Sequence, residues 1–144
     1  MSLIGAYDDD NIFAKILRGE IPCVKVFEDD VAIAFMDLFP QSRGHTLVLP
    51  KAVRARNFLD LPAEKVGPYM ERVQRVAIAV EKALKPDGVT VTQFNGAPAG
   101  QTIFHLHFHI IPRWADMSLK AHATGKMADL ADLNDTAARI KAKL

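Results

Sequence analysis

Hydrophobic and polar positions follow two different periods along this chain, and each period predicts a type of element. In NIFAKILRGEIP, apolar residues recur at helical spacing and Gly19 follows them, which predicts a short helix at about residues 12–18. Residues 62–85 carry apolar side chains every three or four positions, which predicts the longest helix. Pro68 lies inside that pattern, so we expect a kink or a later helix start there.

Five shorter segments are rich in apolar and β-branched residues, which favours strands. The first two, VKVFED and VAIAFMD, meet at an acidic turn and predict a hairpin. The other three are HTLVLP, VTVTQFN and IFHLHFHIIP, and a polar helix is predicted at about residues 127–143. Because strands and helices do not alternate strictly, the pattern predicts an α+β fold, with an antiparallel sheet and helices to one side.

Composition and charge narrow the class of protein. The 144 residues suit one domain, which we assign to residues 11–144, after a polar and mobile N-terminus at residues 1–10. The 18 basic and 17 acidic residues give no electrostatic support for binding nucleic acid or an anionic membrane. The single cysteine, Cys23, cannot form an intramolecular disulfide. No secretory signal or membrane span is visible, so we expect a cytoplasmic protein.

Three of the five histidines stand in one predicted strand, where His105, His107 and His109 alternate with apolar residues. Successive side chains of a strand point to opposite faces, so the three imidazoles should share one face, each about 6.6 Å from the next. The intervening residues should lie on the core face: Phe104, Leu106, Phe108 and Ile110.

This histidine row has three interpretations. It could be a polar, solvent-facing row, or it could hold zinc, since two histidines at i and i+2 of a strand can bind one ion. It could also supply a nucleophile, because a neutral imidazole can form a covalent intermediate and its pKa of about 6.5 suits physiological pH. The preceding loop, NGAPAGQT, is either an ordinary turn or a cradle of backbone N–H groups for a phosphate. Its place directly before the row favours the nucleophile.

The segment GQTIFHLHFHIIPR resembles the signature of the histidine triad (HIT) superfamily, His-x-His-x-His followed by apolar residues. NIFAKILRGEIP and VFEDDVAIAFMDLFPQSRGHTLVLPK resemble the N-terminal half of HIT hydrolases, so the likeness covers about residues 11–114. The resemblance implies a five-stranded antiparallel sheet with one long and one short helix, extended across a homodimer. It also implies a purine nucleotide substrate and reaction at the α-phosphate through a nucleotidyl-histidine.

The same resemblance assigns a role to each of four histidines. The middle residue of the motif, His107, is the implied nucleophile. The backbone carbonyl of His105 is expected to accept the other ring proton of His107, and His109 is expected to contact the phosphate. His45, in the segment RGHTLVLPK, matches a fourth histidine of the family.

Further residues match the nucleotide contacts of the family. Asp37 matches the acidic residue that holds the ribose hydroxyls, although it could instead cap a turn before Pro40. The polar residues expected near the phosphate and leaving group are Asn95, Gln101 and Thr102. The apolar residues expected around the base, which could equally be plain core, are Ile12, Phe13, Ile16, Phe35 and Leu38.

One departure from the family bears on cofactors. Many bacterial relatives carry Cys-x-x-Cys where this chain has Asn11 and Ala14, and a further histidine where it has Val53. With the first histidine of the motif those residues form a structural zinc site, so no zinc is expected here. The implied reaction requires no metal, although Mg²⁺ could accompany a polyphosphate. We expect His122 on a surface loop and Trp114 either beside the active site or at a dimer edge.

Together these observations predict a nucleotide hydrolase or transferase. Its substrate would be a nucleoside phosphoramidate or a dinucleoside polyphosphate, and the residues leave that choice open because both activities share the motif. The alternative is a non-catalytic nucleotide-binding or scaffold protein of the same fold, in which the histidines serve recognition only. A metal-binding protein is the third possibility.

Overall fold

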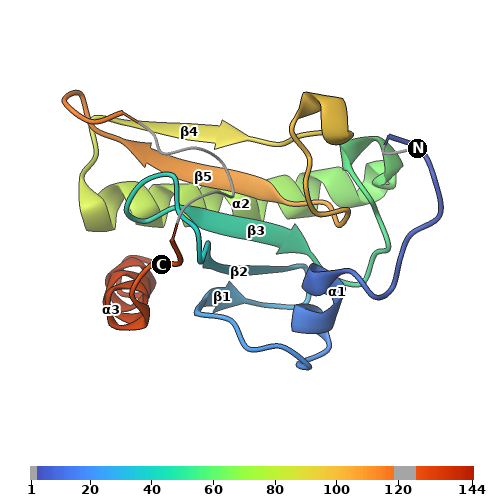
Figure 1. The fold of residues 1–144 in the computed structure, drawn as a ribbon, viewed down its shortest axis with the longest axis horizontal. Coiled ribbons are helices and arrows are strands. Elements are labelled where there is room, and N and C mark those ends of the chain that lie inside the picture. The colour runs from blue at the N-terminus through green and yellow to red at the C-terminus, as the bar shows by residue number, and fades with distance from the viewer. Residues whose placement is uncertain (1–2, 119–125) are drawn as a thin grey trace.

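A five-stranded antiparallel sheet forms the centre of the molecule (Figure 1). The structure is a computed structural model, and it describes residues 3–118 and 126–144. Its strands lie in the order β1-β2-β3-β5-β4. They are β1 (Lys25–Glu28), β2 (Ala32–Met36), β3 (Thr46–Pro50), β4 (Gly88–Thr92) and β5 (Phe108–Arg113). Every neighbouring pair is antiparallel, which confirms the predicted α+β class.

Within the described ranges, three α-helices accompany the sheet: α1 (Ile12–Leu17), α2 (Ala63–Leu84) and α3 (Leu130–Lys141). The Asn11 side chain begins α1 by accepting a hydrogen bond from the Ala14 N–H. The long helix begins at Ala63 and continues past Pro68, so the later start considered from the sequence is wrong. The C-terminal helix is shorter than the predicted range of residues 127–143.

Helices cover both faces of the sheet, which corrects the expectation that they lie to one side. On one face, α2 and α3 pack against alternate residues of β2, such as Ala34 and Met36. On the other face, Phe13 of α1 packs against Phe35 of β2 and Leu47 of β3. Figure 1 shows α2 behind the sheet and α1 in front of it. Among the described residues, no helix is both long and apolar enough to cross a bilayer.

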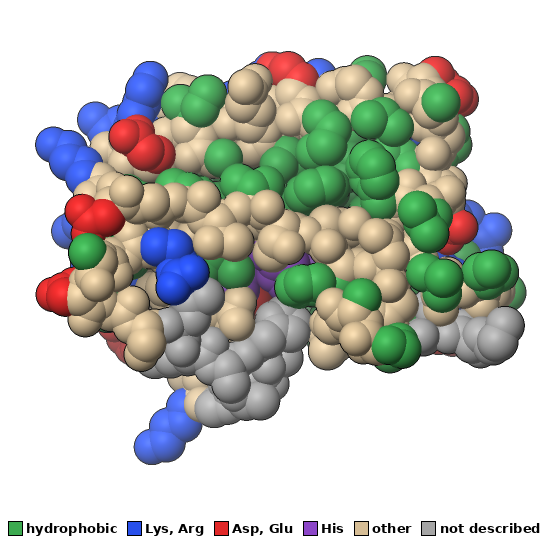
Figure 2. All heavy atoms as spheres, turned by 90° about the horizontal axis from the view of Figure 1, so that it is seen from above, with side chains coloured by type: hydrophobic (Ala, Val, Ile, Leu, Met, Phe, Trp, Pro, Cys, Tyr) green, Lys and Arg blue, Asp and Glu red, His purple; other side chains and the backbone are tan. Residues whose placement is uncertain are grey.

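The two edges of the sheet differ in how well they resist another strand. Edge strand β1 carries Lys25 and Glu28 and has an irregular register between Lys25 and Phe27, and charges and bulges of this kind discourage further pairing. Edge strand β4 has the sequence GVTVT, without a charge, and its Val91 is 47% exposed. Figure 2 looks down on the molecule from the β4 side and shows hydrophobic side chains gathered there. The β4 edge is therefore the open one.

The N-terminal segment lies against the body of the protein. Asn57 donates a side-chain hydrogen bond to the Leu3 carbonyl at 3.0 Å, and Arg56 donates to the Ala6 carbonyl at 3.1 Å. Arg54 pairs with Asp9 through two contacts of 3.0 and 2.7 Å. The mobility predicted for residues 1–10 stays a prediction, and these contacts oppose it for residues 3–10.

Candidate active site

The ring of His107 is held by the backbone of the histidine row. Its Nδ1 donates to the His105 carbonyl oxygen at 2.6 Å, which is the contact that the sequence resemblance implied. An imidazole that carries its hydrogen on Nδ1 has a lone pair on Nε2. Phe13 packs edge-on against the ring, with the centroids 4.9 Å apart, and His107 is only 6% exposed. The nitrogen able to attack an electrophile is therefore fixed in orientation.

This contact also explains why β5 is shorter than predicted. The sequence favoured a strand at residues 103–112, but β5 begins at Phe108. The carbonyl of His105 accepts from the ring of His107, and the N–H of Leu106 donates to the Ala55 carbonyl at 2.9 Å. These groups are thus used outside the ladder with β3, which pairs only with the residues from Phe108 onward. Leu106 and Ile110 are nevertheless core residues, as expected.

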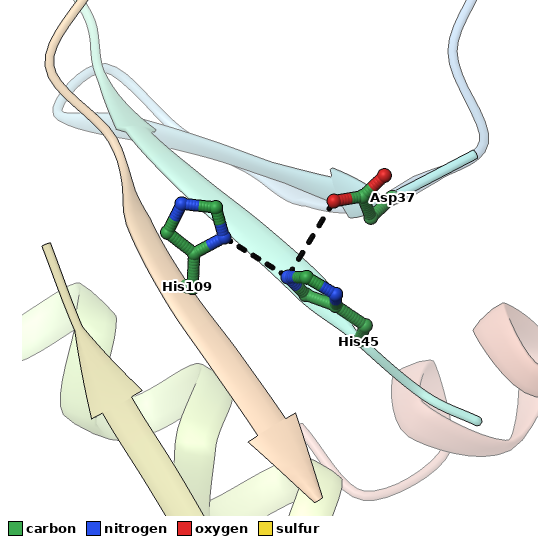
Figure 3. Close-up of side chains that lie close together, drawn as sticks. All are labelled: Asp37, His45 and His109. Atoms are coloured by element: carbon green, nitrogen blue, oxygen red, sulfur yellow. Dashed lines mark hydrogen bonds and ion pairs between the residues drawn. The ribbon is translucent and has the colours of Figure 1, made fainter. Parts of the chain in front are cut away.

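A second hydrogen-bonded set joins His109 of β5 to His45 and Asp37 (Figure 3). The backbone N–H of Gln41 donates to His45 Nδ1 at 3.0 Å, so that nitrogen offers a lone pair. The hydrogen of a neutral His45 must then lie on Nε2, which is 3.0 Å from His109 Nδ1 and 3.5 Å from Asp37 Oδ2. His45 donates to His109 in this arrangement, which leaves the hydrogen of His109 on Nε2.

Ligand atoms of Asp37, His45 and His109 all lie within 4.8 Å of one another, a spacing that would suit a metal ion. The proton arrangement does not suit one. A metal-bound imidazole nitrogen must offer a lone pair, whereas the Gln41 N–H assigns the hydrogen of His45 to Nε2. Binding a cation through Nε2 would require His45 to give up its contact with Gln41. These residues therefore fit a hydrogen-bonded network better than a metal centre.

The ring of His105 points away from this network, into a hollow lined also by Tyr7, Ala14 and Val53. Its Nδ1 lies 2.5 Å from the Tyr7 hydroxyl and its Nε2 lies 3.3 Å from the Pro50 carbonyl oxygen. Burial lowers the pKa of His105 to about 4, against a smaller opposing effect of the Pro50 carbonyl, so the ring is neutral at physiological pH. Ala14 and Val53 offer no metal ligand. The absence of structural zinc stays a prediction, which these side chains favour.

An apolar cleft of about 150 Å³ opens beside His107 and His109. Asp37 and Thr102 line it with the histidines. All five apolar residues expected around a base also line it: Ile12, Phe13, Ile16, Phe35 and Leu38. The sequence did not predict that Ile103 and Cys23 also line the cleft. Their positions in the chain could have suggested it, because Ile103 directly follows Thr102 and Cys23 lies shortly after α1. The structure thus brings most of the predicted residues together around one cleft.

Of the three polar residues expected near the phosphate and leaving group, two do not line the cleft. Gln101 is 3% exposed, accepts from the Gly96 N–H at 2.8 Å and donates to the Arg56 carbonyl at 2.6 Å. The side-chain oxygen of Asn95 accepts from the Phe58 N–H at 3.0 Å. Both side chains therefore hold the loop before the histidine row in shape, and a direct contact with the leaving group does not follow from where they lie.

The expected phosphate cradle in that loop is largely occupied by the loop itself. Within and around the short 3₁₀ turn at Ala97–Ala99, the Ala99 and Gln101 N–H groups donate to the Gly96 carbonyl, and the Gly100 N–H donates to the Ala97 carbonyl. The Gly96 N–H donates to Gln101. These four N–H groups are therefore bonded within the loop, as in an ordinary turn, and the prediction that the loop offers free N–H groups to a phosphate is wrong for them.

Comparisons with known proteins agree with this geometry. The model of the HIT domain matches residues 18–116. The chain belongs to the HIT family. One HIT relative is the adenylylsulfatase HINT3 of Arabidopsis thaliana, 40% identical over 121 residues that cover 80% of this chain and 61% of that protein. This chain thus spans less than two thirds of the plant relative. Another is the adenosine 5′-monophosphoramidase hnt1 of Schizosaccharomyces pombe, 42% identical over 71% of this chain and 73% of that protein.

Solved HIT structures show the same fold. A HIT-like protein from Bartonella henselae, described as involved in cell-cycle regulation, superposes with a TM-score of 0.90 at 48% identity, covering 97% of this chain and all of that one (100%). A zinc-bound histidine triad protein from Mycobacterium smegmatis gives a TM-score of 0.77 at 30% identity, with 93% and 92% of the two chains covered. The HIT fold expected from the sequence is therefore confirmed.

The sequence assigned no role to two residues, Trp114 and His122. Trp114 lines a separate hollow beside α3, together with Arg113 and Leu133, and it does not line the cleft of this HIT domain. Of the two places considered for Trp114, the one beside the active site of the same chain is therefore wrong, and the one at a dimer edge stays a prediction. His122, expected on a surface loop, lies outside the described residues.

Proposed function

We propose that this HIT protein is a nucleotide hydrolase or transferase that acts at the α-phosphate through a nucleotidyl intermediate on His107. The observation that carries the proposal is the 2.6 Å hydrogen bond from His107 Nδ1 to the His105 carbonyl, which puts the lone pair of the neutral ring on Nε2, beside the cleft. The names of two relatives, an adenylylsulfatase and an adenosine 5′-monophosphoramidase, refer to bonds at the phosphate of an adenosine nucleotide. Substrates of this class are nucleoside phosphoramidates and dinucleoside polyphosphates.

The cleft supports binding of a purine nucleoside in one orientation. The base lies among apolar residues such as Phe13 and Phe35, where an aromatic face gains stacking and burial. The ribose hydroxyls donate to the carboxylate of Asp37, whose Oδ1 already accepts the Phe39 N–H at 2.8 Å and is thereby oriented. In this orientation the α-phosphate lies beside His107 and His109, which line the same cleft.

The reaction then proceeds in two displacements. His107 Nε2 attacks phosphorus in line, an N–P bond forms, and the P–N or P–O bond to the leaving group breaks. The leaving group takes the electron pair of that bond and a proton from solvent, which the exposed, cleft-lining Thr102 relays. Water next attacks phosphorus, the N–P bond breaks and Nε2 regains its lone pair. The proton lost from this water replaces the one given to the leaving group.

The contact with the His105 carbonyl assists the first displacement. As Nε2 bonds to phosphorus, positive charge develops on the imidazole, and a hydrogen bond from its Nδ1–H to a carbonyl becomes charge-assisted. The acceptor is already in place at 2.6 Å, so the stabilisation requires no rearrangement during the reaction. The Nε2–H of His109 is the corresponding donor for the phosphoryl oxygens.

The test compares the wild-type protein with His107→Asn on adenosine 5′-phosphoramidate and on a diadenosine polyphosphate. We expect turnover to fall by about a thousandfold or more, as when other enzymes lose their nucleophile. AMP binding, measured by calorimetry, should persist in the variant and serves as the control for an intact cleft. Undiminished turnover in His107→Asn refutes the mechanism.

The same preparation separates the enzyme from a non-catalytic binding protein. An acid-labile nucleotidyl adduct, trapped by rapid quenching and located on His107 by mass spectrometry, is expected only of the enzyme. AMP binding without turnover of either substrate and without an adduct would instead identify a nucleotide-binding or scaffold protein of the HIT fold.

We further propose a homodimer that pairs the β4 edges of two copies into one sheet. The uncharged sequence of β4 and the exposed Val91 support this, whereas the charged and irregular β1 edge opposes pairing there. Light scattering after gel filtration should give twice the 15.9 kDa mass of the chain. Val91→Lys should shift the mass toward one chain, and an unchanged dimer in that variant excludes the β4 edge as the interface.

A further inference from the structure

His105 has two contacts on its ring that lie outside the cleft. The Tyr7 hydroxyl is 2.5 Å from Nδ1, and the two rings meet edge to face with centroids 5.7 Å apart. On the other side of the ring, Nε2 faces the Pro50 carbonyl oxygen at 3.3 Å. A carbonyl oxygen only accepts, so Nε2 carries the hydrogen and Nδ1 offers the lone pair. The Tyr7 hydroxyl is consequently the donor to His105.

Both partners keep the protonation state that this hydrogen bond needs. Burial lowers the pKa of His105 to about 4, so Nδ1 stays unprotonated at neutral pH. Burial also raises the pKa of Tyr7, against a smaller lowering effect of Asn11, so the phenol keeps its hydrogen. Of the other side chains that line the same hollow, Ala14 and Val53 are apolar. Arg54 is paired with the Asp9 carboxylate, and Arg18 donates to the Asp9 carbonyl.

Several contacts fix Tyr7 in front of His105. The Arg54 guanidinium lies 5.4 Å from the centre of the Tyr7 ring and is itself paired with Asp9 at 2.7 Å. Arg18, at the end of α1, donates to the Asp9 carbonyl at 2.7 Å. The N-terminal segment around Tyr7 is thus tied both to α1 and to the chain that follows β3, and its placement is built by several side chains.

The backbone of His105 connects Tyr7 to the nucleophile. The carbonyl of His105 accepts from His107 Nδ1 at 2.6 Å, and the N–H of the next residue, Leu106, donates to the Ala55 carbonyl at 2.9 Å. Since this stretch lies outside the β5 ladder, the direction of the carbonyl depends on what holds the His105 ring and the neighbouring backbone. Tyr7 and Pro50 hold that ring from opposite sides.

We infer that Tyr7 is a positioning residue, whose hydroxyl holds the His105 ring and so aims the His105 carbonyl that orients His107. Tyr7 itself does not touch the substrate, because it lines a hollow separate from the cleft. The link to turnover rests on the proposed function, whereas the link from Tyr7 through His105 to His107 is a property of the free protein.

The decisive variant is Tyr7→Phe, which removes one oxygen and keeps the ring beneath Arg54. The matched control is Tyr69→Phe, because the Tyr69 hydroxyl is also a buried donor, to the Val48 carbonyl at 2.7 Å, in the core on the α2 side of the sheet. Asp9→Asn is a second variant that loosens the N-terminal segment and leaves Tyr7 unchanged. It should act in the same direction as Tyr7→Phe, but more weakly.

Two readouts are compared. Nitrogen NMR of the histidine rings, without substrate, should show Nδ1–H as the dominant form of His107 in the wild type and in Tyr69→Phe, and a mixture of tautomers in Tyr7→Phe. In the kinetic assay, Tyr7→Phe should lower kcat about tenfold with less than about a twofold change in KM, the size expected when one hydrogen bond that aligns a nucleophile is lost. Tyr69→Phe should lower stability and leave kcat unchanged.

Three results overturn the inference: an unchanged His107 spectrum in Tyr7→Phe, an unchanged kcat despite a changed spectrum, or an equal loss of kcat in Tyr69→Phe. A wild-type protein that turns over neither substrate contradicts the proposed function instead. In that case the spectra alone decide whether Tyr7 orients His107.

Discussion

The buried ring of His105 should make the protein less stable as the pH falls from neutral to mildly acidic. Burial lowers the pKa of this ring from 6.5 to about 4 in the folded protein. The unfolded chain exposes the ring, which then regains the ordinary pKa of about 6.5. Between these two values the unfolded state binds a proton that the folded state does not. The contribution of His105 to the free energy of unfolding therefore has its full value above pH 6.5 and is lost as the pH falls toward 4.

The size of this effect follows from the difference between the two pKa values. Each pKa unit corresponds to about 1.36 kcal/mol, so the step from 6.5 to about 4 amounts to roughly 3 kcal/mol when the titration is complete. Small domains unfold with a free energy of about 5–15 kcal/mol, so a loss of this size is readily measured. Asp29, whose pKa is lowered, adds its own loss of stability, but only at more acidic pH than His105.

The assay is urea unfolding at pH 7.5, 6.5, 5.5 and 4.5, followed by circular dichroism, for the wild type and for His105→Asn. The variant keeps a polar side chain at this position without a group that titrates in the range. The free energy of unfolding of the wild type, minus that of the variant, should fall by roughly 2 to 3 kcal/mol between pH 7.5 and 4.5. A difference that stays constant within about 0.5 kcal/mol over this range refutes the reasoning.

Three further outcomes test other parts of the structure. Gly44 has a φ of +90° and an added Cβ would meet Leu84 and Pro112, so Gly44→Ala should lower the free energy of unfolding by about 2 kcal/mol, whereas Gly67→Ala, in open space on α2, should not. Cys23 lines the cleft, so AMP at ten times its Kd should slow alkylation of this thiol about tenfold; equal rates would place the nucleotide elsewhere. Asp37→Asn should raise the Kd for AMP, measured by calorimetry, about tenfold through loss of charge-assisted hydrogen bonds, and an unchanged Kd argues against a ribose contact.

The elements that the sequence predicted well are those whose apolar period is long or whose residues are strongly β-forming. The pattern of α2 extends over six turns and was predicted to within one residue at each end. The strand that contains the histidines was predicted to be too long. The period of apolar residues does not reveal where a side chain donates to a backbone carbonyl that would otherwise accept from the neighbouring strand. The His107 ring uses the His105 carbonyl, and the ladder with β3 therefore starts only at Phe108.

The sequence predicted the residues of the candidate site that belong to a motif. It did not predict contacts between residues that lie far apart in the sequence. His107, His109 and Asp37 line one cleft as expected. Gln101 carries an amide that could assist a leaving group, yet its hydrogen bonds hold together the loop that precedes the three histidines of the motif. Tyr7 stands in a short polar segment without any periodic pattern, and its contact with His105 spans 98 positions of sequence, so only the three-dimensional structure reveals it.

The unequal edges of the sheet also determine how far an assembly of this chain can grow. An interface that uses the same strand of both copies is isologous, and it is saturated once two copies have met. The β1 edge, with its charges and irregular register, gives a third copy no comparable strand to extend. In the proposed dimer, pairing through β4 would thus end in a closed pair with twofold symmetry, whose two outer β1 edges oppose the open-ended strand addition that leads to fibres.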